Sequence, residues 1–452
     1  MAYDKVVDSA SLDSKLTQVA DAIRTKGNTS ADLQFPSGFI SAIQAIQTGT
    51  ELQIIVTVTS GATVTATKGS TTVSGTAVNG TCTLTVPEAG TWSVKATRNG
   101  QTSDTKSVTF TDRYTTSLTF FSATITVTVE SGASVVLKKN GTTLQTKTST
   151  GTAVFTVTET GTYTVEATKS GQTVSGSVNV VSSTTSYALT LSFVSSTLNN
   201  NDWSKIKSVS DAGQGANYWS VGDRKAVTLN GTVGALTLSN FTTYAFIIGF
   251  NHNSSVEGTN RIHFQLGKTA LSGGTDVALC DSYYNNTGGG FRMNTSNSSS
   301  GGWASSNMRT AICGTSLSIY FGTIIAVIPA ALRAVLKSVI KYTDNTGGGS
   351  TAASAVTATT DYFFLLSEYE VFGTISQGNP NESSKQAQYS YYSAGNSKVK
   401  YNHSATSTAV SWWLRSPLAI YSTGFAIVIT DGTVIDGGGA HYSVGFAPGF
   451  CV

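Results

Sequence analysis

An internal repeat constrains the fold of the first half of this chain more than any other feature. Four glycine-containing segments recur at a constant spacing of 71 residues, pairing Gly61 with Gly132, Gly80 with Gly151, Gly90 with Gly161, and Gly100 with Gly171. A constant period is the signature of a structural unit that occurs more than once. We therefore expect two copies of one small domain in tandem, at residues 50–120 and 121–192.

Each copy alternates apolar and polar residues, as the strands of a half-buried sheet do. Cys82 and Val86 alternate with threonines in the first copy, and Phe155 and Val157 lie in the matching segment of the second. Turn residues separate such segments about every 8–12 residues. The pattern predicts two immunoglobulin-like β-sandwiches that act as spacers. Because Cys82 aligns with Ala153, no disulfide between the sheets is expected.

Residues 1–49 are expected to form two short helices. Apolar residues recur at helical spacings in both, and Phe35-Pro36 opens the second. The two apolar stripes are Leu12, Leu16, Val19 and Ile23, and then Phe39, Ile40, Ile43 and Ile46. A unit this small cannot bury both stripes alone, so we expect it to dock on a partner or to self-associate. The alternative is a helical cap on the following domain.

Residues 193–452 are predicted to form one larger α+β domain. Helices are expected to begin at Asp202 and at Pro329, whereas Tyr244–Phe250 and Phe363–Leu366 are expected to be strands. The buried face of the second helix is predicted to be Leu332, Val335, Leu336, Val339 and Ile340. Gly-, Ser- and Thr-rich stretches are expected to form surface loops at 286–302 and 345–360. The predicted fold class is multidomain and mainly β.

Composition excludes several classes of partner. The formal net charge is +3 and charged residues make up 12% of the chain, about half the usual share of roughly 25%, so no nucleic-acid binding is expected. The longest apolar run, Leu317–Leu336, contains Pro329 and Arg333, so no membrane insertion is expected. The first residues lack the pattern of a signal peptide. These features fit a virion component that is made in the host cytoplasm and released by lysis.

A series of motifs in the C-terminal half occurs in a specific order. They are WSVGDRKAVTL (219–229), IIGFNH (247–252), GGW…MRT (301–310), LKSVIKYT (336–343), FLLSEYEVFG (364–373), YYSAGNSKVKY (391–401), SWWLRSP (411–417) and DGTVIDGGGAHYSVGFAPGFCV (431–452). Together they resemble a family of phage and gut-bacterial domains of unassigned function that is related to the C-type lectin fold. Separately, residues 7–46 are similar to N-terminal segments of phage tail and baseplate-associated proteins.

The resemblance implies a C-type-lectin-like, ligand-binding domain over residues 193–452. It also implies that residues 1–49 attach the chain to other tail or baseplate proteins. Some members of the wider lectin-fold group are targets of diversity-generating retroelements, which rewrite codons in a C-terminal stretch while the scaffold is kept. A variable binding surface near the C-terminus is therefore implied. Because tail fibres are usually trimeric, a homo-oligomer is expected.

Candidate contact residues follow the SWWLRSP motif. Large apolar residues in the loop between Pro417 and Thr423-Gly424 indicate an interface, and tyrosines give contact area at a low entropy cost. Gly437–Gly439 is expected to leave space for a partner. The predicted ligand-binding face is Leu418, Ala419, Ile420, Tyr421, Ser422, Ile429, Ile435, Asp436, His441 and Tyr442. The alternative is that Leu418, Ile420, Ile429 and Ile435 fill the core.

Other residues that could carry chemistry are interpreted as structural. Trp412, Trp413 and Arg415 are expected to be scaffold, with Arg415 paired to a carbonyl or carboxylate. Asn379-Pro380-Asn381-Glu382 resembles a lectin sugar motif but has no Trp-Asn-Asp partner segment, so no calcium is expected. The cysteines and histidines lack metal-ligand spacing, and the cysteines are expected to be buried and inert. No catalytic residue, metal or cofactor is predicted.

The sequence therefore predicts a non-enzymatic phage tail adhesin that binds a host-cell receptor, either protein or glycan. The alternative from another class is a tail-associated polysaccharide depolymerase. In that case Glu368 and Glu370 would supply two carboxylates from the same face of one strand. A third alternative places a binding protein of the same fold on a bacterial surface or on a capsid.

Overall fold

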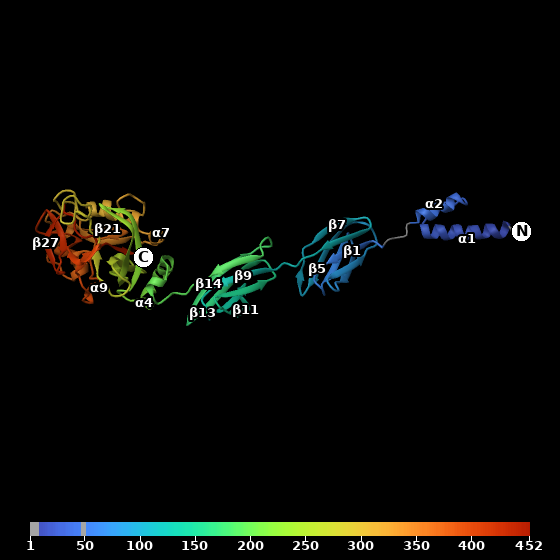
Figure 1. Ribbon diagram of the computed structural model, residues 1–452, viewed down its shortest axis with the longest axis horizontal. Coiled ribbons are helices and arrows are strands. Elements are labelled where there is room, and N and C mark those ends of the chain that lie inside the picture. The colour runs from blue at the N-terminus through green and yellow to red at the C-terminus, as the bar shows by residue number, and fades with distance from the viewer. Residues whose placement is uncertain (1–8, 47–50) are drawn as a thin grey trace. The chain divides into compact units, whose positions relative to one another are not determined.

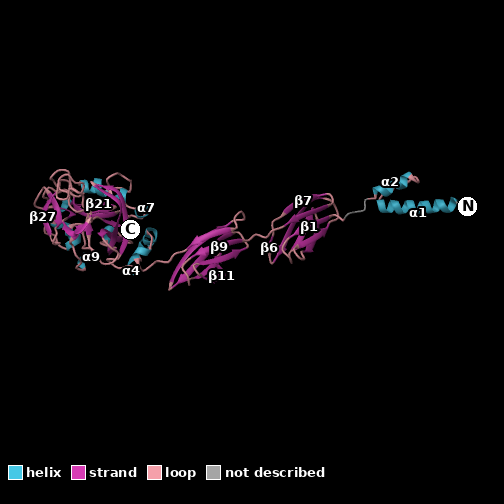
Figure 2. Cartoon of the chain, in the orientation of Figure 1, coloured by secondary structure: helices cyan, strands magenta, loops and turns pink. Residues whose placement is uncertain are grey.

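The computed structural model describes residues 9–46 and 51–452. The chain divides into two compact units, Met1–Phe193 and Val194–Val452, while the predicted boundary at residues 49 and 50 lies outside the described residues. Strands hold 41% of the residues and helices 18%, so the prediction of a mainly β, multidomain chain is confirmed. Figure 2 distinguishes the strands and helices by colour. None of the helices in the described ranges is long and apolar enough to cross a membrane.

Two helices form at the N-terminus, as predicted: α1 (Ser9–Gly27) and α2 (Ser37–Ala45) (Figure 1). We call residues 9–46 the helical pair. Ala20, Ile23 and Phe39 are buried between the helices. Much of the predicted apolar surface stays exposed, namely Leu12, Val19, Phe35, Ile40 and Ile43. The helical pair therefore does not bury both stripes within itself.

The two repeats form β-sandwiches with the same strand order. The first contains β1 (Gln53–Thr57), β2 (Thr63–Lys68), β3 (Thr71–Thr76), β4 (Thr81–Thr85), β5 (Gly90–Arg98), β6 (Gln101–Thr102), β7 (Lys106–Phe110) and β8 (Arg113–Ser117). The second contains β9 (Ala123–Thr128), β10 (Ser134–Lys139), β11 (Thr142–Thr148), β12 (Thr152–Val157), β13 (Gly161–Lys169), β14 (Gln172–Val180) and β15 (Ser186–Thr190). The sheets are β4-β1-β8 and β3-β2-β5-β6, with β7 paired to β5, and then β12-β9-β15 and β11-β10-β13-β14.

Equivalent positions of the two sandwiches make equivalent contacts. Trp92 and Tyr163, which are 71 residues apart, are both buried. The indole N–H of Trp92 donates to the carbonyl of Glu88 at 3.2 Å, and the Tyr163 hydroxyl donates to the carbonyl of Glu159 at 2.9 Å. Each aromatic ring thus fills a core while its polar atom finds a partner four residues earlier. The prediction of a repeated sandwich from the 71-residue period is confirmed.

The C-terminal unit is built on a five-stranded sheet in the order β16-β17-β18-β28-β22. Its strands are β16 (Arg224–Val233), β17 (Leu236–Phe250), β18 (Ile262–Lys268), β22 (Phe363–Phe364) and β28 (Gly449–Cys451). Strand β28 therefore lies inside the sheet, between β18 and β22. Helix α3 (Trp203–Asp211) begins at Asp202, whose carboxylate accepts a hydrogen bond from the Lys205 amide at 2.7 Å. Trp203 packs on the rings of Phe264 and Phe450.

Smaller sheets and short helices surround this sheet. They are β25 (Trp412–Pro417), β26 (Gly424–Val428) and β27 (Val434–Gly439); β19 (Val277–Ala278), β23 (Lys400–Asn402) and β24 (Ala405–Val410); and the pair β20 (Val339–Asp344) and β21 (Val356–Asp361). The short helices are η1 (Leu198–Asn200), α4 (Gly215–Tyr218), α5 (Ser254–Glu257), η2 (Met308–Cys313), α6 (Ile324–Val327), α7 (Ala330–Arg333), η3 (Ala353–Ala355), α8 (Glu368–Phe372), η4 (Pro380–Ser384) and α9 (Ser390–Ser393).

Two predicted elements differ from the observed ones. The helix predicted from Pro329 lasts a single turn, α7, and Val339 already belongs to β20. From there burial alternates, since Val339 and Lys341 are buried while Ile340 is 41% exposed, as pairing with β21 requires. The segment that contains Glu368 and Glu370 was predicted to be a strand, but it forms helix α8.

Candidate functional site

The loop between β25 and β26 places part of the predicted face at the surface. Its base is fixed, since the Leu418 amide donates to the Gly424 carbonyl at 3.1 Å and the Ala419 amide to the Gln377 carbonyl at 2.8 Å. Leu418 and Ala419 are buried. The next two residues stand out from this base: Ile420 is 71% exposed and Tyr421 48% exposed. The loop thus presents two large side chains to solvent.

Residues after β27 continue the same surface. The Ala440 amide donates to the Thr423 carbonyl at 2.9 Å, which joins this segment to the end of the β25–β26 loop. Tyr442 is 40% exposed, and its ring lies 4.4 Å from that of the half-buried His441, measured between centroids. Two further predicted residues are exposed, Ser422 in the β25–β26 loop and Asp436 within β27. We call Ile420, Tyr421, Ser422, Asp436, His441 and Tyr442 the exposed face.

Loops that are distant in sequence border the exposed face. The Ser299 amide donates to the Ser422 carbonyl at 2.8 Å, so the Ser- and Gly-rich stretch predicted at 286–302 lies beside it. Tyr284 forms a parallel bridge with Ser443. The residues before them, Tyr283 and Tyr442, are therefore neighbours in register. Tyr283 is 45% exposed and was not among the predicted residues. Only the fold reveals this neighbour, because the two tyrosines are far apart in sequence.

Four predicted residues do not belong to the exposed face. Leu418 and Ala419 are core residues, as the alternative interpretation held for Leu418. Ile429 lies in the turn at the other end of β26, a strand of about 13 Å at ~3.3 Å per residue. Ile435 pairs with Ile427 along the strands, and both Ile429 and Ile435 pack against the core. These four side chains support the surface or lie away from it.

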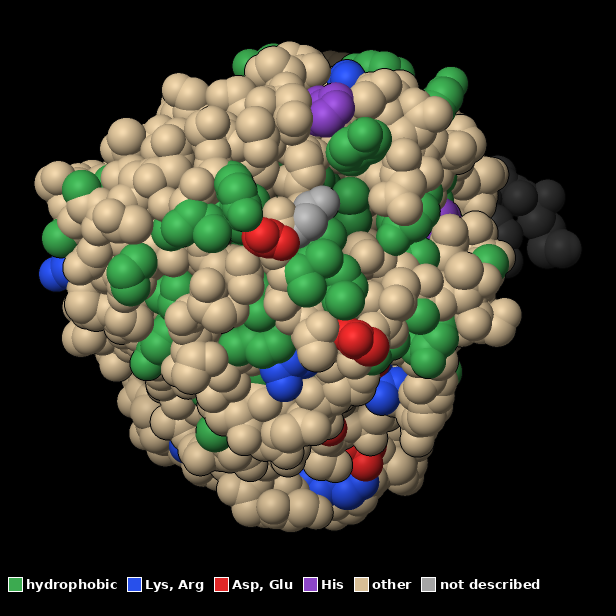
Figure 3. Space-filling model, turned by 90° about the vertical axis from the view of Figure 1, so that its left-hand side faces the viewer, with side chains coloured by type: hydrophobic (Ala, Val, Ile, Leu, Met, Phe, Trp, Pro, Cys, Tyr) green, Lys and Arg blue, Asp and Glu red, His purple; other side chains and the backbone are tan. Residues whose placement is uncertain are grey.

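Gly438 of β27 serves internal packing. A methyl group added at Gly438 would lie 2.6 Å from the Trp413 ring and 2.7 Å from Ile427. The expectation that Gly437–Gly439 leaves space for a partner is therefore wrong at Gly438, because the core already fills that space. Figure 3 views the molecule from the side on which β27 lies in Figure 1. Hydrophobic side chains are scattered over this face and charged ones are few.

A buried ionic network lies in the scaffold of this unit. The Lys341 ammonium donates to Glu257 at 2.9 and 3.0 Å, to Glu370 at 2.9 Å and to the Tyr389 hydroxyl at 2.8 Å. The Arg415 guanidinium binds both carboxylate oxygens of Glu370. Burial alone would raise the pKa of Glu370, but the charges of Arg415 and Lys341 outweigh it and hold that pKa well below its usual range. The predicted pairing of Arg415 is confirmed.

The two carboxylates of the depolymerase alternative face inward. Glu370 belongs to the ionic network, and Glu368 accepts hydrogen bonds from the backbone amides of Ser376 at 2.6 Å and Gly378 at 2.7 Å. Both side chains are fully buried. They come from the first turn of α8, which Ser367 caps, and not from one face of a strand. This pair therefore lines no cleft that a polysaccharide could enter.

The Asn379–Glu382 motif is also internal. The Asn379 amide donates to the Asp344 carboxylate at 2.9 Å, and Glu382 accepts from the Asp344 backbone amide at 2.9 Å and from the Ser416 hydroxyl at 2.6 Å. Burial raises the pKa of Glu382 to about 7, against the opposing effect of these hydrogen bonds. In a lectin, the oxygens of such a motif would bind a sugar through calcium. Here they form hydrogen bonds that link η4 to β20 and β25.

Three buried residues could offer ligand atoms to a metal. Nitrogen or oxygen atoms of His252, Glu257 and His263 lie within 4.8 Å of one another. However, the Lys341 ammonium already donates to both carboxylate oxygens of Glu257. Burial and then the Lys341 charge lower the pKa of His263 well below its usual value. A second cation would have to displace Lys341, so this group fits a metal poorly.

The four cysteines are free and buried. Burial raises the pKa of Cys280 to about 12 and that of Cys313 well above its usual value. Thiols held protonated in this way are poor nucleophiles. The interpretation of Cys280 and Cys313 as buried, inert residues agrees with these surroundings.

The fold defines a modular β protein with two tandem sandwiches and a terminal α+β unit that displays the exposed face. Residues 279–452, which include that whole face, match the model of a domain of unknown function (DUF6273). No curated protein matches the chain.

Several solved structures are similar to parts of the chain. The minor pilin GBS52 of Streptococcus agalactiae is 10% identical, over 31% of this chain and 94% of the pilin, with a TM-score of 0.22. The Bacillus anthracis TIE protein is 11% identical, over 43% of this chain and 44% of that protein, with a TM-score of 0.17. A family CBM26 module from Eubacterium rectale Amy13K, solved with maltoheptaose, is 14% identical, over 31% of this chain and 91% of the module, with a TM-score of 0.13.

Proposed function

We propose that this chain is a non-enzymatic adhesin whose C-terminal unit binds a receptor on a host cell through the exposed face. One observation carries the proposal. Ile420, Tyr421 and Tyr442 stand exposed together on segments that backbone hydrogen bonds join, although burying side chains of this size is worth about 1.5–3 kcal/mol each. Exposed apolar clusters of this kind mark interaction sites, and tyrosine is well suited to them.

The remaining parts of the chain fit a supporting role. In the proposal the two sandwiches act as immunoglobulin-like spacers, and the helical pair attaches the chain to other proteins of a phage tail. The C-terminal unit is a C-type-lectin-like domain, and the assembled protein is a homo-oligomer such as a trimer. Identification of the chain among the proteins of purified virions by mass spectrometry tests the location. Its detection on bacterial surfaces or on capsids, and its absence from tails, would favour the third alternative.

The proposal extends to diversification of the exposed face by a retroelement. Deep sequencing of the corresponding gene region in a natural population tests it. We expect substitutions at codons for exposed residues such as Tyr421, Asp436 and Tyr442, and fixed codons for the buried Leu418 and Ala419. A uniform distribution of substitutions over exposed and buried positions would contradict diversification while leaving receptor binding to be tested by direct measurement.

A further inference from the structure

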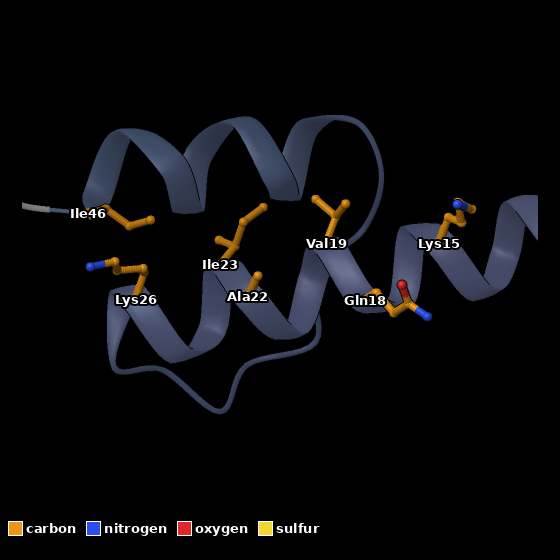
Figure 4. A pocket seen from close by; sticks show the side chains of 7 residues that line it. All are labelled: Lys15, Gln18, Val19, Ala22, Ile23, Lys26 and Ile46. Carbon is orange, nitrogen blue, oxygen red and sulfur yellow. The ribbon is translucent and has the colours of Figure 1, made fainter.

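The helical pair contains an open apolar groove of about 420 Å³ that no described side chain covers. Val19, Ala22, Ile23 and Ile46 line it, and Figure 4 shows Val19, Ile23 and Ile46 between the two helices. Val19 is 48% exposed, and Leu12, seven residues earlier on the same stripe of α1, is 46% exposed. The apolar surface thus continues along α1, as is required of a groove that binds a second helix.

The charges at the edge of this groove are all of one sign. Lys15 and Lys26 line it together with the neutral Gln18 (Figure 4). Within the described residues neither lysine forms an ion pair, whereas Arg24, on another side of α1, binds Asp21. The two lysines are eleven residues apart, which corresponds to about 16 Å along a helix at ~1.5 Å per residue. An eleven-residue step also returns nearly to the same side of a helix.

From this geometry we infer that the groove binds an amphipathic helix of another protein, with acidic residues beside its apolar stripe. Carboxylates about eleven residues apart on that helix would meet Lys15 and Lys26. A second copy of the helical pair lacks this chemistry. Its α2 carries no charged residue, and the two acidic residues of its α1, Asp13 and Asp21, are eight residues apart instead of eleven, with Asp21 already paired with Arg24. Charge complementarity therefore favours an acidic partner over self-association. The inference rests on the attachment role in the proposed function and identifies the chemistry of its partner.

A pair of synthetic peptides tests the inference. Both form an amphipathic helix with the same leucine stripe, and they carry either two glutamates or two lysines eleven residues apart beside it. Binding of each labelled peptide to the full chain is measured by fluorescence anisotropy. We expect the glutamate peptide to bind about tenfold more tightly, because two exposed ion pairs replace two repulsions. We also expect the preference to shrink as salt is added.

Charge reversal in the protein provides the decisive comparison. The double variant Lys15→Glu/Lys26→Glu is expected to prefer the lysine peptide, whereas the control Lys95→Glu/Lys385→Glu, with the same net charge, is expected to keep the original preference. All four side chains are exposed, so the fold is retained, as circular dichroism will verify. Three outcomes would each overturn the inference. They are equal binding of both peptides, no binding of either peptide, and oligomers of the full chain that dissociate on the substitution Val19→Asp. Cell binding by the same variants, measured separately, shows whether receptor binding stands independently.

Discussion

At the residue scale, the C-terminal unit depends on charges that are paired inside the core. Arg415→Met leaves Glu370 buried with Lys341 as its remaining cation, and removal of one partner from a buried pair costs about 3–5 kcal/mol. We expect the free energy of unfolding of this unit to fall by that amount in urea titrations. In the double variant Arg415→Met/Glu370→Gln part of the loss is recovered, because the network then holds one cation, Lys341, and one carboxylate, Glu257. Unchanged stability of Arg415→Met would show that the pair is not formed.

Also at the residue scale, the buried carboxyl group of Glu382 predicts that the stability of this unit depends on pH. The folded-state pKa of Glu382 is about 7, above the value of about 4.3 for an unfolded glutamate. Between these values the folded state binds more protons, so the contribution of Glu382 to stability falls as the pH rises. We expect Glu382→Gln to raise the free energy of unfolding by about 3–4 kcal/mol at pH 8 and to leave it unchanged at pH 4. An equal effect at both pH values would contradict a raised pKa.

At the element scale, the β25–β26–β27 sheet fixes the exposed face through close packing. Gly438→Ala would bring a methyl group to 2.6 Å from Trp413, and overpacking of this kind costs about 1–3 kcal/mol. We expect a matching drop in the free energy of unfolding and weaker receptor binding, because the segment that carries Tyr442 shifts. Thr423→Ala, at an exposed position beside the same strands, serves as the control and is expected to change neither quantity.

Sequence patterns predicted the elements to different degrees. The repeat was readable because period-two alternation and turn residues agree in both sandwiches. The helix predicted from Pro329 starts where expected but was predicted too long, because apolar residues at helical spacing continue to Val339, where pairing with β21 decides the conformation. Ser367 and Glu370 form the S-x-x-E signature of a helix start. The sequence therefore contains the signal for helix α8 at the segment that was predicted to be a strand.

The candidate site was predictable only in part, for a physical reason. Inside a loop no periodicity separates buried from exposed residues, so Leu418 and Ile420 could not be told apart before the fold showed hydrogen bonds on both sides of Leu418. The contribution of Tyr283 and the inward direction of Glu368 likewise depend on contacts between segments far apart in sequence.

At the scale of the whole molecule, the proposed function assigns receptor binding to the C-terminal unit, and reach and attachment to the other parts of the chain. The exposed face lies within the C-terminal unit alone, and the sandwiches carry exposed apolar residues of comparable exposure, such as Val78, Tyr114 and Leu144. What distinguishes the exposed face is that hydrogen bonds and a β-bridge bring its segments together with Tyr283, so the proposal rests on this grouping and not on exposure alone. A comparison of variants in the exposed face with variants in the sandwiches distinguishes a specific receptor-binding surface from nonspecific hydrophobic adhesion.

Binding of the labelled full chain to a panel of bacterial strains tests most directly whether the exposed face binds a host receptor. We expect saturable binding to a host strain, and a loss of at least about tenfold in the triple variant Ile420→Ala/Tyr421→Ala/Tyr442→Ala, since a few anchor residues carry most interface energy. The control Val78→Ala/Tyr114→Ala/Leu144→Ala is expected to bind like the unaltered chain. Absence of saturable binding across the panel, or equal binding by both triple variants, would contradict the account.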